Sequence, residues 1–121
     1  MDLITSRREV GGVTIADLKG RIVLGEESAH LRNLVSEMLS HGDKKILLNL
    51  AQITYIDTSG LGNLINAFAQ ARKQGAELKL LKLPPKVQDV MQITKLYTVF
   101  DILNDEAEAV RSFSRAAAAT T

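Results

Sequence analysis

The order of apolar and polar residues changes its period several times along the chain, and these changes predict alternating strands and helices. Two short runs, LITSRREV (3–10) and VTIADLKG (13–20), flank the pair Gly11-Gly12. Two such runs joined by Gly-Gly are typical of a β-hairpin. The chain is therefore predicted to open with a hairpin.

A helical period follows from about Ser28 to His41. Its apolar residues fall on one helical face, at Leu31, Leu34, Val35 and Met38. Ser28 suits the N-cap position, and Gly42 can take the left-handed conformation after the last turn. The next segment, KKILLNL (44–50), is almost continuously apolar after two lysines. Such a run is typical of a central strand that is covered on both faces.

The segment after residue 57 has a helical period again. Its predicted face is formed by Leu61, Leu64, Ile65 and Phe68. Arg72 and Lys73 in the last turn favour the helix dipole, and Gly75 is expected to end the helix. The run ELKLLKL (77–83) predicts the next strand.

Two prolines separate this strand from the last part of the chain. Pro84-Pro85 ends the strand and can start a helix, whose apolar residues are Val87, Val90 and Met91. TVFDIL (98–103) predicts a short final strand. DEAEAVRSF (105–113) begins a last helix with acidic residues in its first turn.

The predicted order of elements is therefore β-β-α-β-α-β-α-β-α. Strands that alternate with helices from residue 20 onward predict parallel pairing with right-handed crossovers. We expect one α/β domain over residues 1–121, with a mixed, mostly parallel sheet of four to five strands and about four helices. Its core spans about 3–113, and the low-complexity residues 114–121 form a tail that can fray.

Composition narrows the function classes. A chain of 121 residues is long enough for one core. A net charge of +1 with 4% aromatic residues and no Trp argues against nucleic acid as a partner. The absence of Cys excludes disulfides and thiol chemistry. No apolar run resembles a signal peptide or reaches the length of a membrane span, so we expect a cytoplasmic protein with no membrane partner.

The stretch IDTSGLG (56–62) lies where a predicted strand turns into a helix, and in α/β sheets sites lie beyond the carboxyl ends of strands. In a purely structural interpretation, Asp57 or Thr58 caps the helix, and Gly60 and Gly62 allow a tight turn with close packing. In a functional interpretation, Ser59 presents its hydroxyl to another protein. A phosphate there would add roughly −1.5 to −2 charges beside backbone N–H groups at the positive end of the helix dipole.

The residues give little support to an enzyme. A nucleophile elbow needs a glycine where Asp57 stands. The only histidines, His30 and His41, are interpreted as solvated surface residues. The sequence has no P-loop, no cluster with metal-ligand spacing, and no acidic pair of the kind that holds Mg²⁺ in a response regulator. We expect no enzymatic activity, no cofactor and no metal.

The long segment from LLNLAQITYIDTSGLGNL (47–64) to KLYTVFDI (95–102) resembles the STAS family of bacterial anti-sigma factor antagonists. The hallmark is a strand that ends in Asp-Ser/Thr-Ser-Gly-Leu-Gly before a helix, and it stands here as residues 57–62. The resemblance covers roughly residues 3–113.

This resemblance implies a phosphorylation switch. Family members of this type bind an anti-sigma factor that is itself a serine kinase of the GHKL class. That kinase phosphorylates the serine before the first glycine of the hallmark, which corresponds to Ser59, and a PP2C-type phosphatase reverses the modification. By the same resemblance, the partner would be bound by Asp57, Thr58, Gly60, Leu61, Gly62 and Asn63.

One segment departs from the family. Many members carry an Asp after the second strand that touches the kinase, whereas this chain has Val23 and Leu24 there. Either Glu26 or Glu27 replaces that contact, or the partner differs, or both glutamates only favour the N-terminus of the following helix.

Other functions remain open at this stage. One is a STAS scaffold subunit of a stress-signalling or lipid-transport complex. Another is an anion or nucleotide site at the helix N-terminus, although the hallmark contains no Lys or Arg to hold phosphates. We expect a monomer or a weak homodimer, because apolar strand edges in the hairpin could pair between chains.

Overall fold

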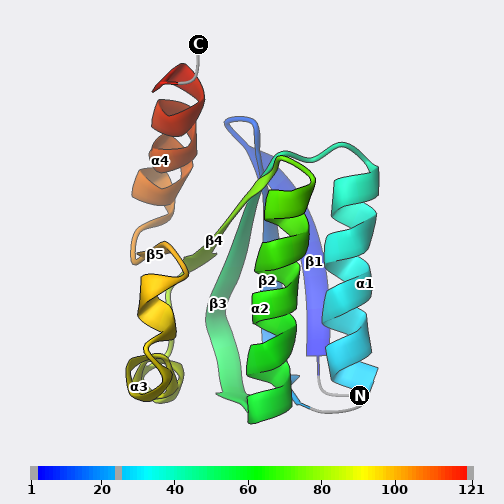
Figure 1. Ribbon diagram of the computed structural model, residues 1–121, viewed down its shortest axis with the longest axis vertical. Coiled ribbons are helices and arrows are strands. Elements are labelled where there is room, and N and C mark those ends of the chain that lie inside the picture. Colours follow the sequence, from blue (N-terminus) through cyan, green and yellow to red (C-terminus); the bar gives the residue numbers. More distant parts are fainter. Residues whose placement is uncertain (1–2, 24–25, 120–121) are drawn as a thin grey trace.

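The strands follow one another in chain order across one sheet, and helices lie against it (Figure 1). The computed structural model describes residues 3–23 and 26–119, with the side chains of 26–28 and 114–119 outside that description. Its elements, in chain order, are β1 (Leu3–Val10), β2 (Val13–Ile22), α1 (Glu26–Ser40), β3 (Lys45–Ile56), α2 (Thr58–Lys73), β4 (Glu77–Leu81), α3 (Pro85–Thr94), the 3₁₀-helix η1 (Leu96–Thr98), β5 (Ile102–Leu103) and α4 (Glu106–Ala119). The predicted order of strands and helices is confirmed.

The N-terminal hairpin is confirmed as well. β1 and β2 pair antiparallel, and Val10 lies opposite Val13 at the turn. Gly11 and Gly12 have φ angles of +58° and +82°. Positive φ at both central residues is the geometry of the two-residue turn that matches the twist of paired strands, and glycine adopts it without strain.

The remaining strands pair in parallel, so the sheet has the order β1-β2-β3-β4-β5. β3 is the central strand, and its consecutive residues Ile46, Leu47 and Leu48 are all fully buried. Consecutive residues of a strand point to opposite faces, so burial of all three requires cover on both sides of the sheet. The apolar run after residue 44 was correctly predicted to be such a strand.

The larger core lies on the face that α1 and α2 cover together (Figure 1). The predicted apolar face of α1 is buried there, with Leu31 and Val35 fully buried. Leu61 and Leu64 bring α2 into the same cluster, and Val87 and Met91 bring in α3. Three helices thus bury one face of the sheet.

The opposite face carries a smaller cluster beneath α4. Ala109 and Phe113 of α4 pack against four apolar sheet residues, namely Val13, Ile15, Leu47 and Leu81. Lys79 on β4 lies beside them, with its Nζ 4.8 Å from the centre of the Phe113 ring and 2.9 Å from the Ser112 hydroxyl oxygen. This face is therefore covered by a single helix.

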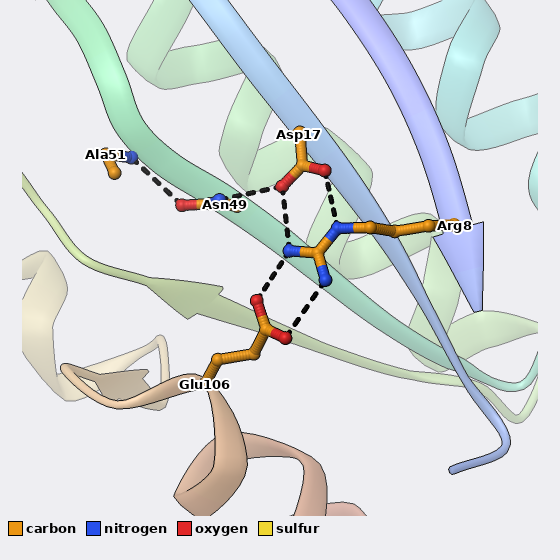
Figure 2. Close-up of polar contacts among 5 residues, drawn as sticks. All are labelled: Arg8, Asp17, Asn49, Ala51 and Glu106. Carbon is orange, nitrogen blue, oxygen red and sulfur yellow. Dashed lines mark hydrogen bonds and ion pairs between the residues drawn. The ribbon is translucent and has the colours of Figure 1, made fainter. Parts of the chain in front are cut away.

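A polar network joins the N-terminus of α4 to three strands (Figure 2). The Arg8 guanidinium forms paired hydrogen bonds with Asp17 and with Glu106, and Asn49 donates to Asp17 at 2.7 Å. The Arg8 hydrogen bonds hold the pKa of both carboxyl groups below their usual values, and the two carboxylates raise the pKa of Arg8. The network ties α4 to the sheet by charge as well as by apolar contact.

Two local predictions are wrong. α1 begins at Glu26, so Ser28 lies inside the first turn instead of capping it; an acidic residue at a helix start is favoured by the dipole. Of the segment 98–103, only Ile102–Leu103 is strand, because Lys95 turns the chain with a φ of +60° into η1. That turn places Phe100 in the core, edge-on to Phe68 with ring centres 5.3 Å apart.

Other details agree with the sequence. Gly42 and Gly75 have positive φ after the helices they end, at +87° and +75°. Pro84 and Pro85 occupy the N-cap and the first position of α3. Within the described residues, no helix combines the length and the apolar character that crossing a membrane requires.

Candidate functional site

The hallmark segment lies at the carboxyl end of β3, where Asp57 joins the strand to α2. The Asp57 backbone is extended, and its Oδ1 accepts a hydrogen bond from the Gly60 backbone N–H at 2.7 Å. That contact makes Asp57 the N-cap and satisfies one of the N–H groups that a helix start leaves without a partner. Thr58 is the first helical residue and is exposed. The two candidates for the cap are thereby distinguished.

The neighbouring end of β2 meets this turn through its backbone. The Asp57 backbone N–H donates to the Ile22 carbonyl oxygen at 3.3 Å. A Cβ atom built on Gly60 would lie 2.0 Å from the same oxygen, closer than real Cβ atoms approach. Gly60 is therefore required for the close approach of α2 to β2. The sequence predicted close packing at Gly60. It did not predict that the Ile22 carbonyl group is the packing partner, because Ile22 is remote from Gly60 in the sequence.

Ser59 is the second residue of α2 and is partly exposed. Its carbonyl oxygen accepts a hydrogen bond from the Asn63 side-chain amide at 2.9 Å. Within the described part of the chain, no side-chain hydrogen bond engages the Ser59 hydroxyl. The hydroxyl thus lies on a turn whose backbone is hydrogen-bonded, and the described residues give it no structural role.

The surroundings of the second glycine of the hallmark are open. No heavy atom of the described chain outside its own helix backbone lies within 4 Å of a Cβ built on Gly62. Thr58, Ser59, Gly62 and Asn63 all retain solvent exposure. These four residues form an accessible surface at the first turns of α2, which we call the motif surface.

Leu61 lies on the buried face of α2, as its helical period predicts, while the partner contact that the family resemblance implies for it stays a prediction. Its side chain is 5% exposed and belongs to the main core. Leu61 faces the sheet because it lies on the same helical face as Leu64, three residues along. Its contribution is to seat α2, and the buried Gly60 acts in the same structural way.

Glu26 and Glu27 are the first two residues of α1. Their side chains lie outside the described residues, so the prediction that one of them contacts a partner stays a prediction. Their position in the first turn agrees with the simpler expectation that they favour the helix dipole.

The two histidines occupy different environments, and neither is part of the hallmark. His30 is partly buried between α1 and β1, and its Nε2 lies 3.2 Å from the Thr5 hydroxyl oxygen. His41 is exposed, and its Nδ1 lies 2.9 Å from the Glu37 carbonyl oxygen. No cluster of three or more His, Asp or Glu side chains that could hold a metal ion occurs among the described residues.

A hollow of about 470 Å³ lies apart from the hallmark, between α3, η1 and β5. It is lined by uncharged side chains: Leu83, Gln88, Met91, Gln92, Tyr97, Ile102 and Asn104. None of the predicted site residues contributes to it. Among the described residues, the candidate site is the motif surface at the start of α2, separate from this hollow.

Comparison with known proteins shows which family the chain resembles. The family model of the STAS domain matches residues 5–109. A putative anti-sigma factor antagonist of Bordetella bronchiseptica, BtrV, is 27% identical over 108 residues, which cover 89% of this chain and 92% of BtrV. The anti-sigma-B factor antagonist of Listeria monocytogenes is 31% identical over 90 residues, which cover 71% of this chain and 79% of that protein.

A solved structure shares the fold. The phosphorylated form of the Bacillus cell fate determinant SpoIIAA superposes with a TM-score of 0.69 over 91% of this chain and 99% of SpoIIAA, at 18% identity. SpoIIAA, an anti-sigma factor antagonist, has also been solved in its unphosphorylated form. The match of the family model over residues 5–109, most of the chain, leads to one conclusion: the chain belongs to the STAS domain family.

Proposed function

We propose that this chain is an anti-sigma factor antagonist that is switched off by phosphorylation of Ser59. In the unphosphorylated state it binds an anti-sigma factor of the GHKL serine-kinase type and so releases a sigma factor. The observation that carries the proposal is the placement of Ser59, a partly exposed residue whose hydroxyl is not hydrogen-bonded within the described residues, on a turn fixed by Asp57 and Gly60. The names of the Listeria and Bordetella relatives agree with this role.

The start of α2 is suited to carry a phosphate. The first turn of α2 contains no acidic residue, and Arg72 and Lys73 lie at its far end. A phosphate on Ser59 would add about −1.5 to −2 charges near the positive end of the helix dipole, which favours it. The modification therefore leaves the helix intact and acts on the partner, through charge and bulk within the interface.

The motif surface is the proposed contact with the anti-sigma factor. Gly62 leaves space at the second turn of α2, so a partner can approach the backbone beside Ser59. A PP2C-type phosphatase would restore the unmodified serine. The proposed partner acts on a sigma factor, so the cytoplasm is the expected location of this exchange.

A kinase assay tests the proposal. Each GHKL-type anti-sigma factor of the source organism is incubated with the protein and ATP, and the modified residue is located by mass spectrometry. We expect phosphate on Ser59, none on Ser59→Ala, and unchanged modification of Thr58→Ala, which removes the adjacent exposed hydroxyl. Phosphate on Ser59→Ala, or no modification and no binding by any of these kinases, would show that the proposal is wrong.

The mechanism has its own test. Phosphorylated protein is expected to keep its helical circular dichroism and to lose affinity for the kinase in calorimetry. Loss of helical signal on phosphorylation would mean that the switch acts by unfolding and not through the interface.

A further inference from the structure

β5 is the last strand of the sheet, at the edge opposite the N-terminal hairpin (Figure 1). The Asp101 carbonyl oxygen accepts a hydrogen bond from the Leu80 backbone N–H at 2.9 Å. The Leu103 carbonyl oxygen accepts one from Lys82 at 2.8 Å. Successive residues of a strand turn their backbone polar groups to opposite sides, so the N–H and carbonyl groups of Ile102 point away from β4. Within the described part of the chain, no hydrogen bond engages these two groups, so β5 offers one donor and one acceptor at its outer edge.

The hollow of about 470 Å³ between α3, η1 and β5 lies beside this edge, and Ile102 is one of its lining residues. Leu83 and Met91 form its buried part, since they are 6% and 1% exposed, whereas Tyr97 is 52% exposed and lies at its rim. The remaining lining residues carry side-chain amides, so none of the lining is charged. All residues from 83 to 104, which include the whole lining, are described. The hollow can therefore receive an uncharged side chain.

Exposed apolar side chains are concentrated in the segment that forms one wall of the hollow. Six large apolar side chains are exposed among the described residues, and three of them lie within residues 93–99. These are Ile93, which is 82% exposed, Tyr97, and Val99, which is 39% exposed. The other three are spread over β1 and β3. A group of exposed apolar side chains of this kind is typical of a protein–protein contact.

Charge does not oppose the pairing of two copies at this edge. A two-fold axis sets each residue of a surface near its own counterpart, so a surface with charges of one sign repels itself. The carboxylate next to Ile102, that of Asp101, lies 3.7 Å from Lys79 Nζ, which offsets its charge. The opposite edge differs, because β1 carries the exposed charged residues Arg7, Arg8 and Glu9. Charged side chains on an edge strand discourage pairing with another chain.

We propose that the β5 edge and the hollow beside it bind a second copy of this chain in a two-fold dimer. The two copies of β5 pair antiparallel, and the Ile102 N–H of each copy donates to the Ile102 carbonyl oxygen of the other. Tyr97 at the rim of each copy packs into the hollow of the other, where side-chain amides can bond to its hydroxyl group. The dimer thus forms at the edge opposite the hairpin, where strand pairing was expected from the sequence.

Two other occupants fit this surface less well. An extended segment of another protein could bond to Ile102, but it would have to supply its own side chain for the hollow. This chain already holds Tyr97 at the rim. An uncharged small molecule could fill the hollow, but it would leave the outward N–H and carbonyl groups of the edge strand without a protein partner.

Sedimentation velocity of the unphosphorylated protein over a series of concentrations tests the dimer. Wild type is expected to shift from monomer to dimer as the concentration rises. Tyr97→Asp is expected to weaken dimerisation by at least about tenfold, because it removes an aromatic anchor and sets two like charges near each other. Tyr55→Asp is the matched control, since Tyr55 is 49% exposed and lies outside the lining of the hollow. This variant is expected to dimerise as wild type does.

Cross-linking tests the strand pairing itself. The chain contains no Cys, so one introduced thiol can form a disulfide only between two copies. Opposed residues of a hydrogen-bonded antiparallel pair have Cα atoms about 5.5 Å apart, within the range that a disulfide spans. Under mild oxidation, Ile102→Cys is therefore expected to form a covalent dimer faster than Ile4→Cys. The latter replaces a more exposed side chain on the opposite edge of the sheet and controls for random collision.

Three results would overturn the inference. They are a wild type that stays monomeric, a dimer that Tyr97→Asp and Tyr55→Asp weaken equally, and cross-linking of Ile4→Cys as fast as that of Ile102→Cys. Circular dichroism and thermal unfolding confirm that each variant is folded. None of the residues in the proposed contact belongs to the motif surface, so the dimer goes beyond the proposed function, and the result of the kinase assay does not decide it.

Discussion

The backbone of Gly60 in α2 lies so close to the carbonyl group of Ile22 in β2 that any side chain at position 60 would collide with it. A Cβ atom there would be 2.0 Å from the carbonyl oxygen and 2.8 Å from the carbonyl carbon. Both groups that would clash are backbone, so neither can move aside by changing a rotamer. The first glycine of the hallmark is thus a requirement of the fold, whereas the second glycine has open space around it.

Substituting the two glycines separates these roles. Gly60→Ala is expected to lower the free energy of unfolding by at least about 1–3 kcal/mol, because α2 must move away from β2. Gly62→Ala, the matched control, is expected to raise it by up to about 1 kcal/mol, because alanine favours a helix more than glycine does. Thermal and urea unfolding followed by circular dichroism measure both changes. Equal stability of Gly60→Ala and wild type would contradict the contact with Ile22.

The contribution of the Asp57 capping hydrogen bond to stability can be measured separately from that of its negative charge. Asp57→Ala is expected to cost about 1 kcal/mol of unfolding free energy, since the Gly60 N–H loses its acceptor. Asp57→Asn retains a side-chain oxygen at the N-cap and is expected to lose much less. Urea unfolding of the two variants gives the comparison. If Asp57→Asn proves as unstable as Asp57→Ala, the negative charge matters more than the hydrogen bond that we assign to it.

The network around Arg8 predicts how stability depends on pH. Hydrogen bonds from Arg8 lower the pKa of Asp17 and of Glu106 from their ordinary values of 3.8 and 4.5. A group whose pKa is lower in the folded state contributes stability above its unfolded pKa and loses it as the pH falls through the folded pKa. The protein is therefore expected to lose stability as the pH falls below about 4.5.

Glu106→Gln tests this network. Both partners keep about a third of their side-chain surface exposed, 39% for Arg8 and 34% for Glu106, so screening by solvent limits the effect. We expect a loss of at most about 1 kcal/mol at neutral pH and a smaller further loss on acidification than in wild type. Urea unfolding at neutral and at acidic pH provides the measurement. An identical acid profile in the variant would argue against a role for the Arg8–Glu106 pair.

Lys79 of β4 contacts the middle of α4. It is only 8% exposed, its Nζ donates to the Ser112 hydroxyl, and it lies 3.7 Å from Asp101 Oδ2. Lys79→Met keeps the length and apolar character of the side chain, and we expect its stability to stay within about 1.5 kcal/mol of wild type. Lys79→Glu places a buried negative charge near Asp101 and is expected to cost about 3 kcal/mol or more. Urea unfolding compares the two; a tolerated Lys79→Glu would mean that α4 does not depend on this contact.

Much of the fold could be predicted because the decisive signals are local. The Gly11-Gly12 turn, the helical faces and the glycines after α1 and α2 each depend on residues within a few positions of one another. One error arose where a distant contact accompanies the conformation. Residues 98–101 were predicted to be strand, but the chain forms η1 over Leu96–Thr98, and Phe100 then contacts Phe68 in the core.

The candidate site was predicted only in part, because only some of its features depend on neighbouring residues. Periodicity and hallmark residues placed Ser59 at the start of a helix, and the structure has it there. Sequence left open whether Asp57 or Thr58 forms the cap, since both residue types can do so. The helical period placed Leu61 on the apolar face of that helix, and the structure has its side chain in the core.

The sequence by itself determined the order of the elements, the hairpin and the position of the hallmark between β3 and α2, because the hydrophobic period and turn chemistry are properties of neighbouring residues. Only the tertiary structure decided that Gly60 rests on Ile22, that Arg8 holds Glu106 across 98 positions of sequence, and that Phe113 of α4 packs against the second face of the sheet. These relationships depend on strand register and on the packing of a helix against a sheet. Such distances between remote residues are fixed only when the whole core assembles.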